Sequence, residues 1–276
     1  MIGKCLFPVA GYGTRFLPAT KSMPKEMLPI VNKPLVQYGV EEAIEAGMSN
    51  CAFVTGRGKR AIADHFDTSY ELEHQISGSS KEQHLEGIRA IMDRGVFTTV
   101  RQRSMRGLGH AILTGQPLIG NEPFGVVLSD DLCLNRERSG VLTQMAALYE
   151  EFQCSIVAIQ KVSPAEICHY GAVAGAAERD GLIRVAQMVE KPTPEQAPSD
   201  LAVIGRYILT PDIFDILRDA SPDERGEIQL TDALKVQASE GRLLAYEFEG
   251  IRFDCGQVPG FVAATQHVFE HYYGQH

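Results

Sequence analysis

The residues best suited to phosphate chemistry follow the first apolar run of the chain, residues 5–9. The segment Gly11-Tyr12-Gly13-Thr14-Arg15 contains two glycines and an arginine. Glycines let backbone N–H groups approach a phosphate closely, and a guanidinium can fork onto its oxygens. The segment therefore predicts a phosphate-binding loop, although a plain turn between strand and helix would also use glycines here.

Two familiar nucleotide-binding motifs are excluded by reading the positions. A dinucleotide fingerprint needs a third glycine where Phe16 stands. A P-loop needs Gly-Lys-Ser/Thr, and Gly58-Lys59 has neither the upstream glycine nor a following Ser or Thr. The loop must therefore serve another class of phosphate site, if it serves one.

Lys25 follows within a segment that carries prolines at positions 18, 24 and 29. Three prolines so close together exclude a long helix and predict a stiff, irregular loop. A lysine on such a loop can hold a point charge beside a phosphate. Alone, it would be read as a solvated surface lysine.

An aspartate pair follows the apolar run 124–128 and should lie at the carboxyl edge of the sheet, beside the Gly11 loop. Asp130 and Asp131 offer carboxylate oxygens, which magnesium prefers. Which of the two points inward is open. We favour Asp130 and interpret Asp131 as a helix N-cap or turn residue.

The elements that position these residues alternate between apolar runs and helical patterns, which predicts a mostly parallel sheet with crossover helices. The strand-like runs lie at residues 5–9, 51–54, 96–100, 124–128, 155–159 and 202–208. Helical spacing occurs at 36–46, 61–73, 109–118 and 140–151. Turn signals at 177–181 and 192–198 predict an antiparallel addition, followed by helices at 211–218 and 227–239, a strand pair near 243–253 and a last helix from about 257.

Together, the segments around Arg15 and Lys25 resemble the signature of sugar-1-phosphate nucleotidyltransferases. The Lys-Glu-Met-Leu-Pro form at 25–29 is similar to that of the uridylyltransferases, whereas the dTTP enzymes favour Lys-Gln-Leu-Leu-Pro. Further motifs keep the family's order nearly end to end. They are Val54 to Lys59, His65 to Asp67, Arg101-Gln102, Gly107 to Ala111, Glu190 to Pro192, Gly205 to Tyr207, Gly226 to Asp232 and Asp254 to Gly256.

The resemblance implies a Rossmann-like three-layer α/β/α fold, with a mixed central sheet and a small antiparallel sugar-binding insertion. It implies one domain, 1–276, with a nucleotide-binding half at about 1–150. The sugar-binding half and C-terminal helices then occupy about 151–276. A homodimer or homotetramer is expected from the same resemblance.

The resemblance also implies roles for individual residues. Arg15 and Lys25 are the catalytic cations. The residues implied in nucleotide binding are Ala10, Gly11, Gly13, Thr14, Glu26, Gln102 and Gly107, with Gln102 on uracil and Glu26 near the ribose. Those implied for the sugar phosphate are Gly171, Glu190, Lys191 and Gly205. Mg²⁺ is implied at Asp130, and related enzymes add an aspartate that matches Asp254.

The implied reaction transfers the uridylyl group of UTP to glucose 1-phosphate. Its nucleophile is already anionic, so alignment and charge stabilisation suffice without a general base. Two alternatives stay open: a nucleotidyltransferase for dTTP or another hexose phosphate, and a non-catalytic paralogue that binds a nucleotide sugar.

Composition excludes other classes of function. The net charge is -9, and no Lys/Arg-rich block is present, which argues against nucleic-acid binding. No apolar run reaches the length of a membrane helix, no secretory leader is seen, and the six cysteines lack metal-site spacing. A cytoplasmic chain with reduced thiols is expected.

One histidine pair resembles a zinc motif. His267-Val268-Phe269-Glu270-His271 matches an inverted zinc-hydrolase pattern, but none of the five residues after it is Asp, Glu or Cys. We therefore expect both histidines to be solvated or to lie at a subunit contact.

Overall fold

The first strand, β1 (Lys4–Pro8), shows how the fold is layered. Cys5 and Phe7 face one hydrophobic cluster, and Leu6, pointing the opposite way, faces another. This alternation follows from the two-residue period of a strand. Apolar residues on both faces therefore require helices on both sides of the sheet.

The computed structural model describes residues 1–135 and 139–274. Within these ranges, nine strands form one sheet in the order β5-β4-β1-β6-β11-β8-β12-β10-β9. After β1, their bounds are β4 (Asn50–Thr55), β5 (Val96–Arg101), β6 (Phe124–Val127), β8 (Ser155–Lys161), β9 (Gly171–Arg179), β10 (Leu182–Glu190), β11 (Leu201–Leu209) and β12 (Leu243–Glu247). Two ribbons pair separately: β2 (Pro29–Ile30) with β3 (Lys33–Pro34), and β7 (Asp131–Leu134) with β13 (Ile251–Asp254).

The sheet is mixed. The pairs β5–β4, β4–β1, β1–β6 and β8–β12 are parallel, whereas β11 runs antiparallel to both β6 and β8. The β9–β10 hairpin adds an antiparallel edge, paired through β10 with β12. The predicted antiparallel addition is thereby confirmed.

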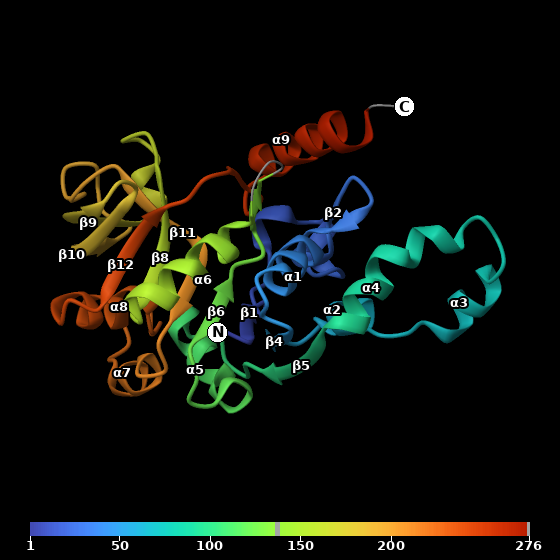
Figure 1. Cartoon of the computed structure of the whole chain (residues 1–276), viewed down its shortest axis with the longest axis horizontal. Coiled ribbons are helices and arrows are strands. Elements are labelled where there is room, and N and C mark those ends of the chain that lie inside the picture. Colours follow the sequence, from blue (N-terminus) through green and yellow to red (C-terminus); the bar gives the residue numbers. More distant parts are fainter. Residues whose placement is uncertain (136–138, 275–276) are drawn as a thin grey trace.

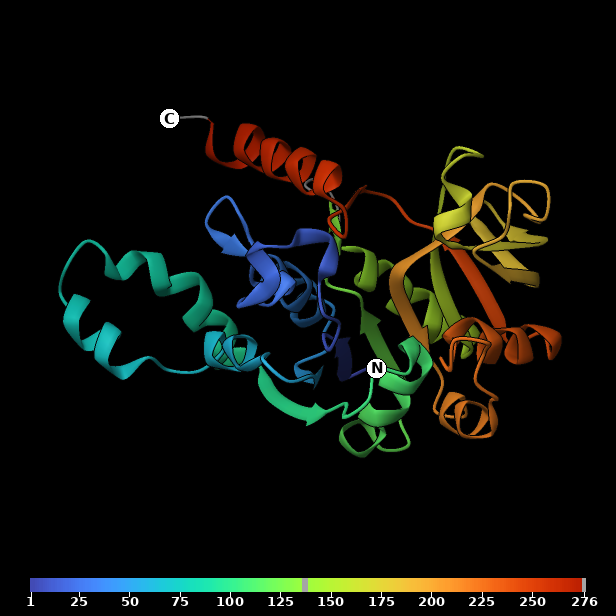
Figure 2. The same ribbon diagram turned by 180° about the vertical axis from the view of Figure 1, so that it is seen from behind.

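Helices cover both faces (Figure 1 and Figure 2). Buried residues of α1 (Leu35–Glu45), α2 (Arg60–His65), α4 (Glu86–Arg94) and α6 (Val141–Phe152) belong to one cluster. Those of α5 (Gly107–Ile119), α7 (Ile213–Asp219) and α8 (Leu230–Ser239) belong to the other. This arrangement confirms the three-layer α/β/α prediction. α9 (Val258–Val268) packs separately, over β2 and β7.

The predicted helix at 61–73 is two helices, α2 and α3 (Tyr70–Ile76). Phe66 ends α2 and is buried against the rings of Phe53 and Phe97. Oδ1 of Asp67 then accepts a hydrogen bond from the N–H of Thr68, a local bond that competes with helix formation. α3 and α4 project beyond β5 in Figure 1.

Two further boundaries differ from prediction. β12 and β13 are not a strand pair: β12 lies between β8 and β10, and β13 pairs with β7. α8 begins at Leu230 and not at 227, because Ile228 pairs instead with the start of α5. Its N–H donates to the carbonyl of Arg106, and its carbonyl accepts from the N–H of Gly109. In the described residues, no helix is both long and apolar enough to cross a membrane.

A buried ion pair joins the sheet to two helices on one of its faces. Nε and Nη2 of Arg206, which is 1% exposed, donate to Oε2 of Glu42 at 3.0 and 2.8 Å. Nη1 of Arg206 donates to the carbonyl of Gly205, and Oε1 of Glu42 accepts from the N–H of Leu142. The pair therefore connects β11, α1 and α6.

Replacing Arg206 with methionine should lower the free energy of unfolding by about 3 kcal/mol, because Glu42 would stay buried without its partner. Urea unfolding followed by circular dichroism measures the loss. The double variant Glu42→Leu/Arg206→Met should recover much of it. A loss below about 1 kcal/mol in the single variant would contradict this account of the pair.

Candidate active site

The loop after β1 holds its predicted phosphate-binding residues at the carboxyl edge of the sheet. Gly13 has a φ of 67°, and a Cβ there would lie 3.0 Å from Cβ of Lys25. A side chain at this position would therefore be both strained and crowded. Thr14 and Arg15 follow in a short 3₁₀ turn (Thr14–Phe16), and both are exposed.

Lys25 and Asp130 form the central ion pair. Nζ of Lys25 lies 2.5 Å from Oδ2 of Asp130, which follows β6. Burial favours the neutral form of both groups, but each charge stabilises the other. The pKa of Lys25 is therefore raised and the pKa of Asp130 lowered. Lys25 thus stays protonated and Asp130 ionised at neutral pH.

Glu26 forms a second, deeper ion pair. Its Oε2 lies 2.6 Å from Nζ of Lys59, and Glu26 and Lys59 are 1% and 6% exposed. Burial raises the pKa of Glu26 against the opposing charges of Lys59 and Lys25. The carboxylate therefore faces Lys59 in this structure, and its place near a ribose stays a prediction.

The predicted base-binding residues lie on neighbouring loops. A Cβ on Gly56, after β4, would lie 2.9 Å from the carbonyl of Ala10 and 3.5 Å from Met105. The loops after β1 and β5 therefore meet over Gly56. Gly11 is exposed, and a Cβ there would touch nothing within 4 Å, so room is left above this loop.

Gln102 and Gly107 complete this part of the site. Gln102 is 4% exposed, and its backbone N–H donates to the carbonyl of Thr55. Gly107 begins α5 with a φ of 87°, and a Cβ there would lie 2.8 Å from the carbonyl of Ile228. Glycine at 107 is therefore required by conformation and by space.

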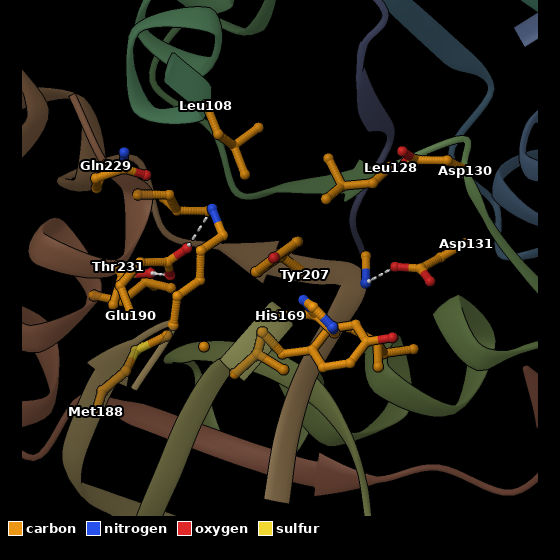
Figure 3. Close-up of a pocket in the computed structure, with 18 of the residues that line it drawn as sticks. Leu108, Leu128, Asp130, Asp131, His169, Met188, Glu190, Tyr207, Gln229 and Thr231 are labelled. Atoms are coloured by element: carbon orange, nitrogen blue, oxygen red, sulfur yellow. Dashed lines mark hydrogen bonds and ion pairs between the residues drawn. The ribbon is translucent and has the colours of Figure 1, made fainter. Parts of the chain in front are cut away.

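A cavity of about 330 Å³ brings the predicted sugar-phosphate residues together with Arg15 and Asp130, whereas Lys25 is not among its lining residues (Figure 3). Oε2 of Glu190 accepts a hydrogen bond from Oγ1 of Thr231 at 2.5 Å, and its Oε1 lies 3.3 Å from Nζ of Lys191. Both interactions are drawn in Figure 3. The predicted residues that line this cavity are Arg15, Asp130, Gly171, Glu190, Lys191 and Gly205.

The interpretation of Asp131 as an N-cap is wrong, whereas it does close a turn, because its N–H donates to the carbonyl of Leu128. Asp131 begins β7, is 9% exposed, and accepts a hydrogen bond at Oδ2 from the N–H of Gly205 at 2.7 Å. Its Oδ1 pairs with Arg252. Both oxygens of this carboxylate therefore bind protein groups, one on β11 and one on β13.

Asp254 faces Asp130 across Gly256. A Cβ on Gly256 would lie 3.0 Å from Oδ1 of Asp254 and 3.1 Å from Oδ2 of Asp130. Two carboxylate oxygens therefore converge at this glycine, where Nη1 of Arg15 also lies 3.4 Å from the Cβ position. Asp254 is oriented by Tyr170, whose hydroxyl donates to its Oδ2, and it lines a second cavity of about 470 Å³ with Arg15, Asp130 and Lys191.

Two carboxylates suit a hard divalent ion that takes its other ligands from water and substrate phosphates. The described residues contain no group of three or more His, Cys, Asp or Glu side chains able to hold a metal by themselves. The donor set therefore fits an ion shared with substrate better than a closed structural site.

His267 and His271 stack on each other, with ring centroids 4.1 Å apart, and His271 is exposed. His267 also contacts the ring of Phe253. The zinc interpretation has no third ligand in the part of the chain that the structure describes.

The sequence alone indicated no role for four polar side chains that form hydrogen bonds or ion pairs with predicted site residues: Lys59, Tyr170, Thr231 and Arg252. One signal was available. Arg252 stands two residues before Asp254, so the two share a face of β13.

Known proteins resemble the chain over almost all of its length. A family model described as Nucleotidyl transferase matches residues 8–271. A UTP–glucose-1-phosphate uridylyltransferase of Pseudomonas aeruginosa is 62% identical over 273 residues, covering 99% of this chain and 98% of the relative.

Two solved structures of UDP-glucose pyrophosphorylase align with this chain over almost the whole of both proteins. Each alignment covers 98% of this chain and 99% of the other chain. The apo structure has a TM-score of 0.95 at 58% identity. The structure complexed with UDP-glucose has a TM-score of 0.92 at 56% identity. Nucleotidyltransferases of this kind generally use a divalent metal ion. With this match in sequence and fold, the chain belongs to the nucleotidyl transferase family.

Proposed function

We propose that the chain transfers the uridylyl group of UTP to glucose 1-phosphate, forming UDP-glucose and releasing pyrophosphate. The observation that carries the proposal is the meeting of two groups of residues at one cavity: Arg15 and Asp130 from the nucleotide half, and Glu190 and Lys191 from the β9–β10 hairpin. Acceptor and donor phosphates can therefore be held side by side.

In this reaction, an oxygen of the sugar phosphate attacks the α-phosphorus of UTP in line. A new P–O bond forms as the bond to pyrophosphate breaks, and the nucleophile needs no deprotonation. Arg15 forks onto phosphate oxygens, and Lys25 places a fixed charge where negative charge develops. The residues' work is alignment and charge stabilisation.

The sugar half is held by the Glu190–Lys191 pair. Oε2 of Glu190 is oriented by Thr231, which leaves its other oxygen able to accept from glucose hydroxyls. Nζ of Lys191, on an exposed side chain beside Glu190, can meet the sugar phosphate. A Cβ on Gly171 would lie 3.4 Å from Oε2 of Glu190, so a larger side chain there would crowd the carboxylate that we propose binds glucose.

We infer that Mg²⁺ is the metal and that Asp130 and Asp254 hold it, since their oxygens converge at Gly256. When bound, it supplies positive charge to the phosphate oxygens.

We also propose that the chain works in a reducing compartment, the cytoplasm, which agrees with its six free cysteines.

A screen of nucleotide and sugar-phosphate pairs tests the function. Pyrophosphate release should be fastest with UTP and glucose 1-phosphate in the presence of Mg²⁺. A faster reaction with dTTP or another hexose phosphate would replace the substrate assignment. No release from any pair would favour the non-catalytic paralogue and overturn the proposal.

A further inference from the structure

The carboxamide of Gln102 has both of its N–H groups occupied. Nε2 lies 2.8 Å from Nδ1 of His110 and 3.4 Å from the carbonyl oxygen of Gly107. A carbonyl can only accept, so the end of the amide that faces Gly107 is the NH₂ end. The remaining hydrogen of that group then points to Nδ1 of His110, which accepts it.

His110 is suited to the acceptor role by its place in the fold. It lies in the first turn of α5, one turn from Gly107, so both acceptors come from the same helix end. Burial, aided by the charge of Arg106, lowers the pKa of His110. The imidazole is therefore neutral at neutral pH, with its proton on Nε2 and a lone pair on Nδ1.

What Gln102 can still offer is its carbonyl oxygen. In the described part of the chain, no hydrogen bond ends on Oε1 of Gln102. An oxygen accepts from the N3–H of uracil or thymine. In cytosine, N3 carries a lone pair, which would face the lone pairs of Oε1. A flipped amide, presenting NH₂, would reverse this preference.

We propose that His110 determines base specificity by fixing the orientation of the Gln102 amide, so that the site selects pyrimidines with an N3–H and rejects cytosine. The inference rests on the proposed function, in which Gln102 faces the base. It adds a positioning residue, His110, that acts on the base only through Gln102.

The dissociation constants of UTP and CTP test this role. Both are measured by calorimetry in the presence of Mg²⁺. Where CTP binds too weakly for direct titration, its constant is obtained from displacement of bound UTP. His110→Leu removes the acceptor, so the preference for UTP over CTP should fall about tenfold, the value of one hydrogen bond. His110→Asn keeps an acceptor oxygen near the position of Nδ1. Its preference should stay within about threefold of the native value.

Two further variants separate the inference from the proposed function. Gln102→Ala should lower the UTP preference at least as far as His110→Leu, and adding His110→Leu to it should change the preference no further. If Gln102→Ala leaves the preference unchanged, the base contact itself is wrong. If it lowers the preference and His110→Leu does not, the base site stands and the role of His110 is overturned.

A structural role for His110 would look different. Loss of packing alone weakens UTP and CTP binding by the same factor and leaves their ratio unchanged, and that result would refute the proposal. His84→Leu changes an exposed histidine outside the site and should alter neither constant. Thermal unfolding of each variant shows that the binding data come from folded protein.

Discussion

Replacing Lys25 with alanine should lower kcat at least about 100-fold while changing the dissociation constant of UTP less than about tenfold. The physical reason is that the charge we propose Lys25 places beside the α-phosphate gains most as negative charge develops in the transition state. The raised pKa of Lys25, held by Asp130 and Glu26 against burial, keeps that charge present at neutral pH. Steady-state rates and calorimetric UTP binding separate the two effects.

The control for Lys25→Ala is a lysine of the same loop outside the ion pair. Lys21 lies in the 3₁₀ turn Ala19–Lys21 and is exposed, so Lys21→Ala should keep native kcat. Loss of the pair with Asp130 should destabilise the fold by only about 1 kcal/mol, since both side chains reach solvent. Unchanged turnover in Lys25→Ala would refute its catalytic role.

The sequence predicts the site well where a residue's position follows from a strand end. Arg15 and Asp130 each come just after a strand of the parallel part of the sheet, and such ends share one edge. Their meeting in one cavity could therefore be expected from periodicity alone. The contribution of Glu190 and Lys191 could not, because it depends on how the β9–β10 hairpin folds over that edge.

Side chains that hold other side chains are harder to predict. Asp131 follows Asp130 directly, and nothing local distinguishes a turn aspartate from one that binds Gly205 and Arg252. Those partners lie far along the chain, and only the pairing of β7 with β13 brings Arg252 to it. Because β13 pairs with β7, it lies outside the main sheet. The pattern of apolar residues does not predict this choice of partner strand.

Helix boundaries show the same limit. Apolar spacing continues through 61–73, but the packing of Phe66 on Phe53 and Phe97 breaks the helix there. At the start of α8, Ile228 gives its backbone groups to α5 in place of a helical turn. Tertiary contacts that compete for backbone groups decide such ends, and local propensity is too weak to oppose them.

Asp130→Asn should lower kcat at least about 100-fold and make the remaining rate nearly independent of Mg²⁺ concentration. The asparagine has the same shape and can still accept from Lys25, so the fold should be intact. What changes is the charge: of the two carboxylate oxygens that converge at Gly256, only that of Asp254 stays anionic. Initial rates over a Mg²⁺ titration, with circular dichroism for folding, measure the effect.

Asp131→Asn is the matched comparison. Asp131 is the next residue along the chain and carries the same carboxylate, but this carboxylate is bound to Arg252 and Gly205. It should lower the free energy of unfolding by about 1–3 kcal/mol, since it weakens a charged hydrogen bond, and leave the Mg²⁺ dependence of the rate unchanged. Opposite results in the two variants, with Asp130→Asn fully active and Asp131→Asn losing its response to Mg²⁺, would transfer the metal to Asp131. Full activity in both would leave Asp254 as the ligand.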